Sequence, residues 1–289
     1  MTELSDKKQA IARIQIISVM IVFGTMGIFV KNIPLASSEI ALWRGIIAFI
    51  VLFIFMIISG KLKEILKLKN NLWKLFFSGA AMGFNWILLF EAYNYTSIAL
   101  STLSYYFAPT IVIIASGLLF KEKLSTKQIF CFLASTSGLI LIIGVNGGGN
   151  NDMIGILYGI GAAVLYATVV LFNKATGEID GITRTWIQFA AAIMMLIPYV
   201  YFTNGFHVAE INTVGIINLL ILGISHTGIA YYFYFSSLSH LKGQQAAILS
   251  YIDPVVAVLL SVFILGESIT ILQLVGGVMV LAFTLINEI

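Results

Sequence analysis

Ten stretches of mostly apolar residues constrain this chain more than any other feature. A helix that crosses the hydrocarbon core of a bilayer needs roughly 20 mostly apolar residues. The qualifying stretches cover approximately residues 11–30, 38–59, 72–93, 97–119, 127–145, 153–174, 181–202, 213–236, 243–265 and 269–287. They predict an all-α polytopic membrane protein with ten transmembrane helices.

Composition agrees with a membrane protein and excludes other classes. Hydrophobic residues make up 60% of the chain and charged residues only 10%, too few to cover a water-soluble surface. The net charge of +3 is small, and the bases form short clusters between apolar stretches, which argues against nucleic-acid binding. The single cysteine, Cys131, can form no disulfide within the chain. No small-residue cleavage site occurs before the first loop, and the first apolar stretch is long enough to span, so we interpret it as a membrane helix and not as a signal peptide.

A segment of the chain occurs twice, at a constant offset of 145 residues. The matching residues are Tyr106, Pro109, Ser116, Glu122 and Gln128 in the first copy, and Tyr251, Pro254, Ser261, Glu267 and Gln273 in the second. Because each half holds five helices, an odd number, the second half must enter the membrane from the opposite face. We predict two inverted five-helix repeats around a central cavity, residues 1–145 and 153–289, joined by a Gly/Asn-rich linker over 146–152. Duplicated halves of this kind are typical of secondary transporters.

The distribution of basic residues predicts the orientation. Short cytoplasmic loops are enriched in Lys and Arg. With the amino terminus inside, almost every base falls on or near the cytoplasmic side, and only Lys31 lies clearly outside. We therefore expect a multi-pass protein of the cytoplasmic (inner) membrane with both termini in the cytoplasm.

The repeated segment also resembles a known family. Each copy is a spanning helix with a proline in it that closes on a glutamate, APTIVIIASGLLFKEKLS and DPVVAVLLSVFILGESIT, and Trp43 and Arg44 lie in the sequence LWRG. These features are similar to the EamA-type branch of the drug/metabolite transporter superfamily. The resemblance covers nearly the whole chain. It implies ten helices, an inverted five-plus-five repeat and transport of a small organic solute through a central cavity, without naming the solute; we expect no cofactor.

Asp253 is the leading candidate for a central binding residue. It lies about ten residues into the ninth predicted helix, directly before Pro254, whereas the first copy has Ala108 before Pro109. Ionisable side chains at membrane depth are costly and usually face water, a partner or a substrate. Both prolines should bend their helices, because each leaves a carbonyl four residues earlier without its usual helical donor. The competing interpretation of Asp253 is a structural ion pair or a cap on the broken backbone.

Other polar and aromatic residues within the predicted helices are candidates for the walls of the site. An aromatic ring can face a solute, and a hydroxyl or amide can bind it. The candidate substrate-binding residues besides Asp253 are Asn85, Trp86, Tyr105, Tyr106, His226, Tyr231 and Ser250. Helix packing is the alternative for most of them, and for His226 a hydrogen bond to a neighbouring hydroxyl.

Arg44 and Glu91 form a second candidate group at similar depth near the outer ends of their helices. A structural salt bridge between them is one interpretation, and an arginine extended toward the headgroups is another. The functional alternatives are an extracellular gate or recognition of a carboxylate. Glu39 lies near the same end and is a further candidate partner for Arg44.

Motif spacing argues against an enzyme. The glycine run Gly147–Gly149 lacks the Lys and Ser/Thr of a phosphate-binding loop, and no GxSxG nucleophile motif occurs. The three histidines lie on separate segments without a neighbour at zinc-ligand spacing, so we expect no metal site.

These observations predict a carrier that moves a small polar or amphipathic metabolite by alternating access, first an amino acid, as an exporter or exchanger. An organic cation or quaternary amine held by Asp253 and aromatic rings is the alternative substrate, and a non-saturating channel the alternative mechanism. Coupling to protons through Asp253 or Glu91 and downhill transport both stay open. The expected partners are the solute and the lipid bilayer. The sequence does not indicate an oligomeric state.

Overall fold

The computed structural model describes residues 2–119, 124–144, 150–177, 179–238, 240–241 and 243–288. Within these residues every regular element is a helix. Glu122 of the repeated segment and the glycines of the predicted linker lie outside the described residues. The division of the chain at 146–152 therefore stays a prediction.

The described helices follow the predicted stretches closely. The first half comprises α1 (Thr2–Gly24), α2 (Met26–Lys31), α3 (Ser37–Ile58), η1 (Lys61–Asn71), α4 (Leu72–Tyr95), α5 (Ile98–Tyr105), α6 (Ala108–Leu119) and α7 (Thr126–Gly144). The second half comprises α8 (Asn150–Thr176), α9 (Gly181–Thr203), η2 (Val208–Glu210), α10 (Thr213–Gly223), η3 (Ile224–Ile229), α11 (Ala230–Leu238), α12 (Gly243–Ser250), α13 (Ile252–Phe263) and α14 (Ile271–Glu288). Among the described residues, seven continuous helical stretches are long and apolar enough to cross a membrane, and three shorter apolar helices accompany them.

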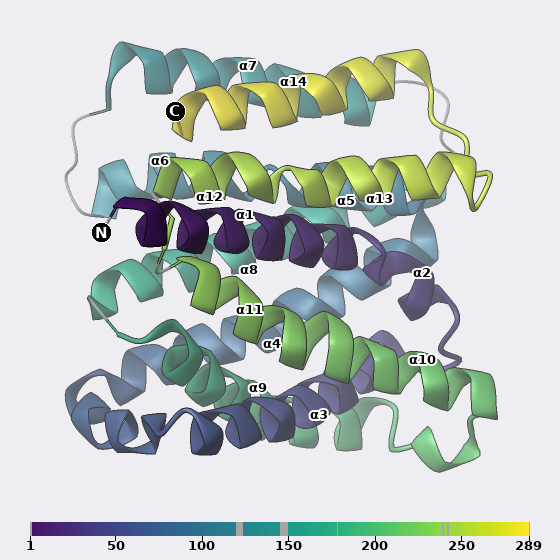
Figure 1. The fold of residues 1–289 in the computed structure, drawn as a ribbon. Helices are drawn as coiled ribbons and strands as arrows, with labels where there is room; N and C mark the ends of the chain where they lie inside the picture. Colours follow the sequence, from purple (N-terminus) through teal and green to yellow (C-terminus); the bar gives the residue numbers. More distant parts are fainter. Residues whose placement is uncertain are drawn as a thin grey trace.

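The helices lie side by side in one bundle, roughly along the horizontal of Figure 1. α7 and α14 form a pair at the top of that view, α3 and α9 lie at the bottom, and α4 and α8 lie between them. Both ends of the chain lie toward the left of the view.

The corresponding broken helices of the two halves run in opposite directions. The amide of Ala99, near the start of α5, lies 3.2 Å from Oγ of Ser261, near the end of α13. The hydroxyl of Tyr106, after the end of α5, lies 2.7 Å from the carboxylate of Asp253, near the start of α13. Moving forward along one segment therefore means moving backward along the other. The prediction of inverted halves is confirmed.

Glycines let some of the helices approach very closely. A Cβ on Gly79 of α4 would lie 2.3 Å from the carbonyl oxygen of Gln188 on α9, and one on Gly276 of α14 would lie 2.5 Å from the carbonyl of Gly138 on α7. Larger residues at either position would push the helices apart. Small residues at such contacts are typical of helix packing in membranes, where apolar side chains gain little by leaving lipid.

Two predicted spans differ from the structure by an interruption that we did not predict. The first span breaks at Thr25, between α1 and α2, where the Thr25 hydroxyl donates to the carbonyl of Val22 at 2.7 Å. The eighth span contains the π-helical turn η3, where the Thr227 hydroxyl donates to the carbonyl of Leu222 at 2.8 Å. In both, a hydroxyl side chain bonds to the backbone of its own helix, which ordinary apolar periodicity does not reveal.

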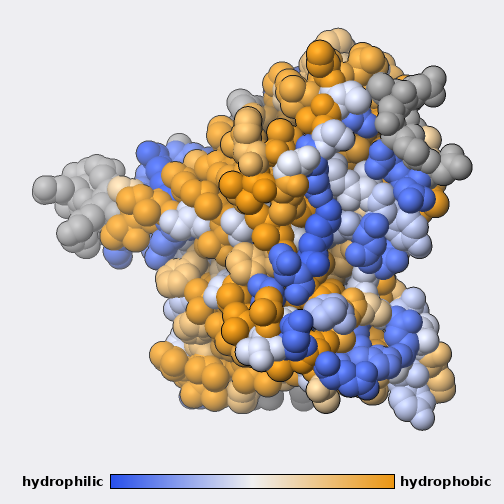
Figure 2. Space-filling model, turned by 90° about the vertical axis from the view of Figure 1, so that its right-hand side faces the viewer, coloured by the Kyte–Doolittle hydropathy of each residue, from blue (hydrophilic) through white to orange (hydrophobic). Residues whose placement is uncertain are grey.

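Apolar side chains cover the flanks of the bundle. Exposed examples occur on many helices, including Ile58, Leu118, Phe130, Met194, Phe202, Phe263 and Ile271. Figure 2 looks at the bundle end-on and shows a strip of hydrophilic residues between apolar surfaces. A water-soluble protein does not expose this much apolar surface, so the fold is that of a polytopic membrane protein.

Candidate functional site

Asp253 and Tyr106 connect the two halves in the middle of the bundle. The Tyr106 hydroxyl donates to Oδ2 of Asp253 at 2.7 Å, and it lies 3.5 Å from the carbonyl oxygen of Ser250. Both side chains are half-buried. Asp253 makes no ion pair with any described residue. The carboxylate therefore keeps an oxygen for a further partner.

Breaks in the helices position these two residues. α5 ends at Tyr105 and α6 begins at Ala108, one residue before Pro109. α12 ends at Ser250 and α13 begins at Ile252, two residues before Pro254. Each proline lies in the first turn of the helix that follows the break, where its missing N–H costs least. The two breaks place Tyr106 and Asp253 opposite each other, because the segments cross in opposite directions.

Arg44 is a buried cation that has no carboxylate partner among the described residues. Its side chain on α3 is 2% exposed, and its Nε donates to the hydroxyl of Thr227 at 2.7 Å. The guanidinium carbon lies 4.7 Å from the ring centre of Trp86 and 5.3 Å from that of Phe90. Aromatic rings stabilise a cation through their electron-rich faces, but they do not neutralise its charge. The two Nη groups make no hydrogen bond within the described part of the chain and are available to an anion.

The π-helical turn η3 aims two consecutive side chains at different helices. Thr227 bonds to Arg44, as described above. His226, which is 3% exposed, places Nε2 2.8 Å from the hydroxyl of Thr25 and Nδ1 3.3 Å from the carbonyl oxygen of Ile221. Both ring nitrogens of His226 therefore have partners, and its contact is with the break between α1 and α2. π-helical turns occur disproportionately at functional sites.

Three tyrosines neighbour both Arg44 and Asp253. The phenols of Tyr93, Tyr105 and Tyr231 all lie within electrostatic range of both charged groups. Tyr105 meets Tyr106 edge-on at 6.0 Å between ring centres. A buried cation and an acid in the interior thus share the same neighbouring tyrosines.

The remaining predicted wall residues lie around this region. Trp86 faces Arg44 and meets Phe189 at 5.2 Å between ring centres. Tyr231 packs edge-on against Phe189 at 5.6 Å. Asn85 is 3% exposed and donates to the carbonyl of Ala162 on α8 at 2.6 Å, which joins the two halves in the core.

Ser250 contributes less directly to the region. Its hydroxyl donates to the carbonyl of Ala246 in its own helix at 2.9 Å. Only its carbonyl oxygen approaches Tyr106. This carbonyl is the one that Pro254 leaves without a helical donor.

The structure does not bring Arg44 and Glu91 together as an ion pair. Glu91 accepts hydrogen bonds from the hydroxyl of Ser37 at 2.6 Å and from Nδ2 of Asn94 at 3.2 Å. Arg44 points instead toward Thr227 and the rings beneath it. Similar depth along two helices does not ensure contact, because the two side chains lie on different faces.

Glu39, the alternative partner, also serves another purpose. Its carboxylate is fully buried and accepts the backbone amides of His207 and Val208 at 2.7 and 2.8 Å, which holds the α9–α10 connection against α3. Trp43 Nε1 donates to the same oxygen at 3.2 Å. Arg44 is therefore left without an acidic neighbour at this end.

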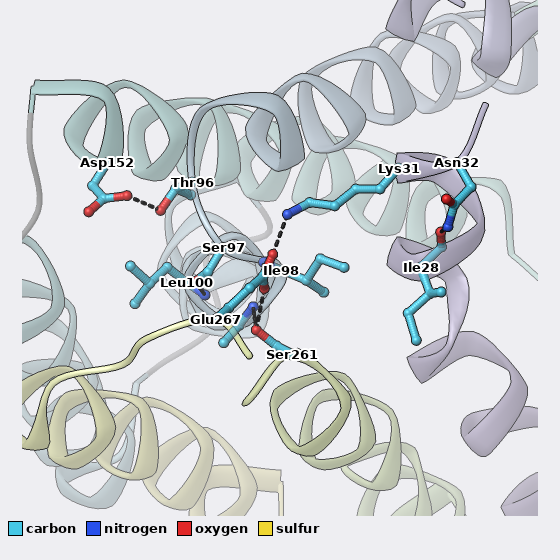
Figure 3. A network of polar contacts seen from close by, with 11 residues as sticks. Ile28, Lys31, Asn32, Thr96, Ser97, Ile98, Leu100, Asp152, Ser261 and Glu267 are labelled. Carbon is cyan, nitrogen blue, oxygen red and sulfur yellow. Dashed lines mark hydrogen bonds and ion pairs between the residues drawn. The ribbon is translucent and has the colours of Figure 1, made fainter. Parts of the chain in front are cut away.

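A polar network that we did not predict lies at one end of the bundle (Figure 3). Lys31, the last residue of α2, forms an ion pair with Glu267 beyond α13. Glu267 also accepts the backbone amide of Ile98 at 2.9 Å and the hydroxyl of Ser261. Beside this network is a cavity of about 360 Å³ whose lining includes Tyr93, Asp152 and Gln273.

The opposite end carries a second ion pair. Nζ of Lys61 lies 2.6 Å from Oδ1 of Asp180, which caps the amino terminus of α9 by accepting the amide of Thr183. Burial alone would raise the pKa of Asp180, but the hydrogen bonds from Lys61 and Thr183 outweigh it and hold that pKa below its usual value. A cavity of about 760 Å³ adjoins this pair and is lined by Asn173, Lys174 and Arg184 among others.

Comparison with known proteins identifies the family. The model of the EamA-like transporter family matches the chain twice, over residues 10–144 and 153–288. The chain belongs to the EamA-like transporter family. This confirms that it is a membrane transporter and not an enzyme.

Relatives of this EamA-like transporter cover three quarters or more of its length. It is 28% identical to the uncharacterized transporter YxxF of Bacillus subtilis over 282 residues. The aligned region covers 96% of this chain and 90% of YxxF. An uncharacterized transporter of Archaeoglobus fulgidus is 26% identical over 270 residues, 92% of each chain. Protein PecM of Dickeya dadantii is 26% identical over 222 residues, which cover 75% of this chain and 74% of PecM.

A solved crystal structure shares the fold of this EamA-like transporter. The two match with a TM-score of 0.66 at 15% sequence identity, over 95% of this chain and 96% of the other. At that identity the likeness concerns the fold alone.

Our sequence analysis missed the groups that complete these arrangements in the EamA-like transporter. Thr25, Thr227 and Lys31 carried no signal, because a single hydroxyl or a lysine at a helix end is common in membrane helices. Glu267 did carry one, since it repeats Glu122 of the first half. The repetition marked its position but not its partners, which come from α2, α5 and α13.

Proposed function

We propose that this transporter carries a small zwitterion, first an amino acid, by alternating access. One observation carries the proposal: Arg44 and Asp253 have the phenols of Tyr93, Tyr105 and Tyr231 as common neighbours, and neither forms an ion pair among the described residues. A charged side chain at the centre of a membrane helix costs roughly 3 kcal/mol on insertion scales. A zwitterion bound between the two would compensate both charges at once.

The chemistry of each group fits one end of an amino acid. The guanidinium of Arg44 has two free Nη groups, which can take a carboxylate in a bidentate arrangement. The carboxylate of Asp253 can accept from an ammonium group while Tyr106 holds it in place. Tyr105, Tyr231 and Trp86 would enclose the part of the solute between the charged groups.

Alternating access is supported by the opposed directions of the two halves. The halves meet at Tyr106 and Asp253, so a solute bound there lies on the boundary along which inverted halves rock in other transporters. The breaks before Pro109 and Pro254 lie at the same place and leave backbone that can change its angle.

The arrangement of bases supports an orientation with both termini in the cytoplasm. Lys61, Lys74 and Arg184 gather at the end that carries the α8–α9 connection, whereas Lys31 lies at the opposite end. By the positive-inside rule the first end faces the cytoplasm. In the cytoplasmic membrane this orientation suits export or exchange of a metabolite. If transport is coupled to protons, the protons would bind to Asp253 or Glu91.

An organic cation is the second candidate substrate. Asp253 surrounded by tyrosine rings is suited to a quaternary amine. The buried charge of Arg44 opposes it, since a second cation nearby would add repulsion in a medium that screens weakly.

The experiment is a ligand screen followed by transport with matched variants. Amino acids, amines and nucleosides are tested for a rise in the melting temperature of the purified transporter, because a ligand that binds only the folded state stabilises it. Amino acids should raise it. Counterflow of the selected amino acid in proteoliposomes should saturate, which a channel would not.

The variants separate the two charges. Arg44→Gln should weaken binding of the amino acid and favour the corresponding amine that lacks a carboxylate, while Asp253→Asn should weaken binding of both by roughly tenfold or more. Glu91→Gln is the control for loss of an intramembrane charge, since Glu91 faces Ser37 and Asn94. Unchanged amino acid binding in both Arg44→Gln and Asp253→Asn would refute the proposal.

A further inference from the structure

We infer that Lys31 and Glu267, together with the start of α5, form a gate that closes one end of the transport path. The inference rests on alternating access, as proposed above, but not on the identity of the solute. In the proposed orientation this is the outer gate.

Glu267 holds three elements together at this end (Figure 3). One carboxylate oxygen pairs with Lys31 at the end of α2. The other accepts the backbone amide of Ile98 at the start of α5 and the hydroxyl of Ser261 on α13. The Ser261 oxygen in turn accepts the amide of Ala99 at 3.2 Å. A single side chain of the second half thus binds two elements of the first half.

The turn after α13 aims Glu267 at this position. Gly266 has a positive φ of 66°, which a residue with a side chain rarely adopts. The amide of Glu267 then donates to the carbonyl of Ser261 at 3.0 Å, which turns the chain back over the end of α13. The glutamate therefore projects toward the first half and not away from the bundle.

The network forms part of the wall of a cavity that also contacts Tyr93, a neighbour of the central charges. Lys31, Glu267 and Leu100 all line the cavity of about 360 Å³. Tyr93 also lines it, is 6% exposed, and lies within electrostatic range of Glu267, Arg44 and Asp253. Tyr93 thus adjoins both this cavity and the central charges. The Lys31–Glu267 pair lies in the wall of the same cavity, where it can control the access of a solute from this end.

Rocking one half against the other must break this network, because its bonds cross from one half to the other. Breaking it is feasible: the Lys31 side chain is 30% exposed and the Glu267 side chain 16%, so water can solvate both when they part. Lys31 also ends a short helix that begins after the interruption at Thr25, so α2 can move without the whole of α1.

The Lys61–Asp180 pair at the opposite end provides the contrast. It also joins the two halves, with side chains 33% and 30% exposed. However, it lies beside α3 and α9, where Trp186 stacks on Phe49 at 4.7 Å and on Phe53 at 5.7 Å between ring centres. That packing holds the two helices together whether or not the ion pair forms. It is therefore a matched control: an ion pair between the halves that does not close the cavity beside Tyr93.

The test measures access to the cavity and requires no substrate. Cys131 is the single cysteine of the chain, so Cys131→Ser leaves a background without thiols. Leu100→Cys places one thiol in the cavity wall, at a position that is 2% exposed. Its rate of labelling by a membrane-impermeant maleimide is then measured in proteoliposomes with Lys31→Gln, Glu267→Gln, Lys61→Gln or Asp180→Asn added.

Lys31→Gln and Glu267→Gln should each raise the labelling rate about tenfold, which corresponds to about 1.4 kcal/mol in the opening equilibrium. Lys61→Gln and Asp180→Asn should leave it within a factor of about two, because neither residue lines the cavity beside Tyr93 and exposed ion pairs have small effects on stability. Labelling that is unchanged in both Lys31→Gln and Glu267→Gln, or that rises equally in Lys61→Gln, would overturn the gate.

Two measurements keep the test decisive. The first is the melting temperature of each variant, which shows whether it is folded. The second is the labelling rate of Lys31→Gln, which still tests the gate if Glu267→Gln does not fold, because Lys31→Gln removes the ion pair and leaves the other bonds of Glu267. Failure of the amino acid screen would leave the labelling result untouched. The labelling rates and the ligand screen therefore test the gate and the substrate proposal independently.

Discussion

Residues 98–119 and 243–263 occupy corresponding places in the two halves, and comparing them shows where the site comes from. Both are broken before a proline, and both carry a tyrosine at the break, Tyr106 and Tyr251. They differ one residue before the proline, where the first segment has Ala108 and the second has Asp253. Ala108 is 1% exposed, whereas Asp253 is half-buried and bonded to Tyr106 across the boundary.

The difference shows how two duplicated halves with the same helix pattern form an asymmetric site. The shared breaks and opposed directions bring the two segments face to face. A single acid then uses the tyrosine of the other segment as its donor. The predictions below exchange or remove the residues that distinguish the two segments.

The largest effect is expected from moving the acid to the other segment. The double variant Ala108→Asp with Asp253→Ala should lose all measurable counterflow and should unfold more readily than the parent. Ala108 is enclosed, and an acid without a partner there would cost several kcal/mol. Transport rates and melting temperatures check this. Recovery of transport would mean that the two segments are interchangeable, contrary to the asymmetry described here.

Asp253→Asn should cause the next largest loss. A hydrogen bond to a charged group contributes about 1.5–3 kcal/mol, so binding of the solute should weaken by roughly tenfold or more. The shift in melting temperature as a function of ligand concentration measures it. Ala108→Ser is the control for a polar change at the corresponding position, and it should leave ligand affinity within a factor of about two, about 0.4 kcal/mol. Equal affinities for the Asp253→Asn variant and the parent would remove Asp253 from the site.

Tyr106→Phe should weaken binding more than Tyr251→Phe. The Tyr106 hydroxyl donates to Asp253 at 2.7 Å, and both substitutions keep the ring contact of 6.1 Å between the two tyrosines. This hydrogen bond positions the Asp253 carboxylate but does not itself contact the solute, so we expect a smaller loss of affinity than for Asp253→Asn, roughly fivefold or about 1 kcal/mol. The comparison fails if the two variants lose affinity equally.

The smallest effects are expected at the prolines. Pro254→Ala restores a backbone donor toward the Ser250 carbonyl and should straighten the helix at Asp253. We expect a higher melting temperature and a counterflow rate lower by a few fold, because flexibility at the break is lost. Pro109→Ala should change the rate less, because no acid adjoins it. A larger effect at Pro109 would show that the first segment is the one that moves.

Much of the fold was predictable from residues alone. Each of the ten apolar stretches contains a helix, and the prolines at 109 and 254 coincide with real breaks, because both signals are local. The repetition of Tyr106 and Pro109 as Tyr251 and Pro254 predicted the inversion, which the antiparallel contacts of α5 and α13 confirm.

The site was predictable only in part. Asp253 was a candidate because an acid in an apolar stretch is costly wherever it points. Arg44 and Glu91 do not form the predicted pair. Their depths along two helices could be estimated from the sequence, but the rotation of each helix about its own axis, which decides where a side chain points, could not. The partner of Arg44 is Thr227, which lies 183 residues away along the chain and is turned inward by a π-helical turn.

By itself the sequence determined that the chain folds in a membrane, how many spans it has and that the two halves are inverted. Hydrophobicity and the length needed to span a bilayer are properties of each segment separately, so they can be read from the residues. Only the tertiary structure decided which polar groups meet. Tyr106 bonds to Asp253, Lys31 pairs with Glu267, and Arg44 has no acidic partner among the described residues. These contacts between distant helices depend on the rotation and spacing of each helix, which the close packing of side chains sets.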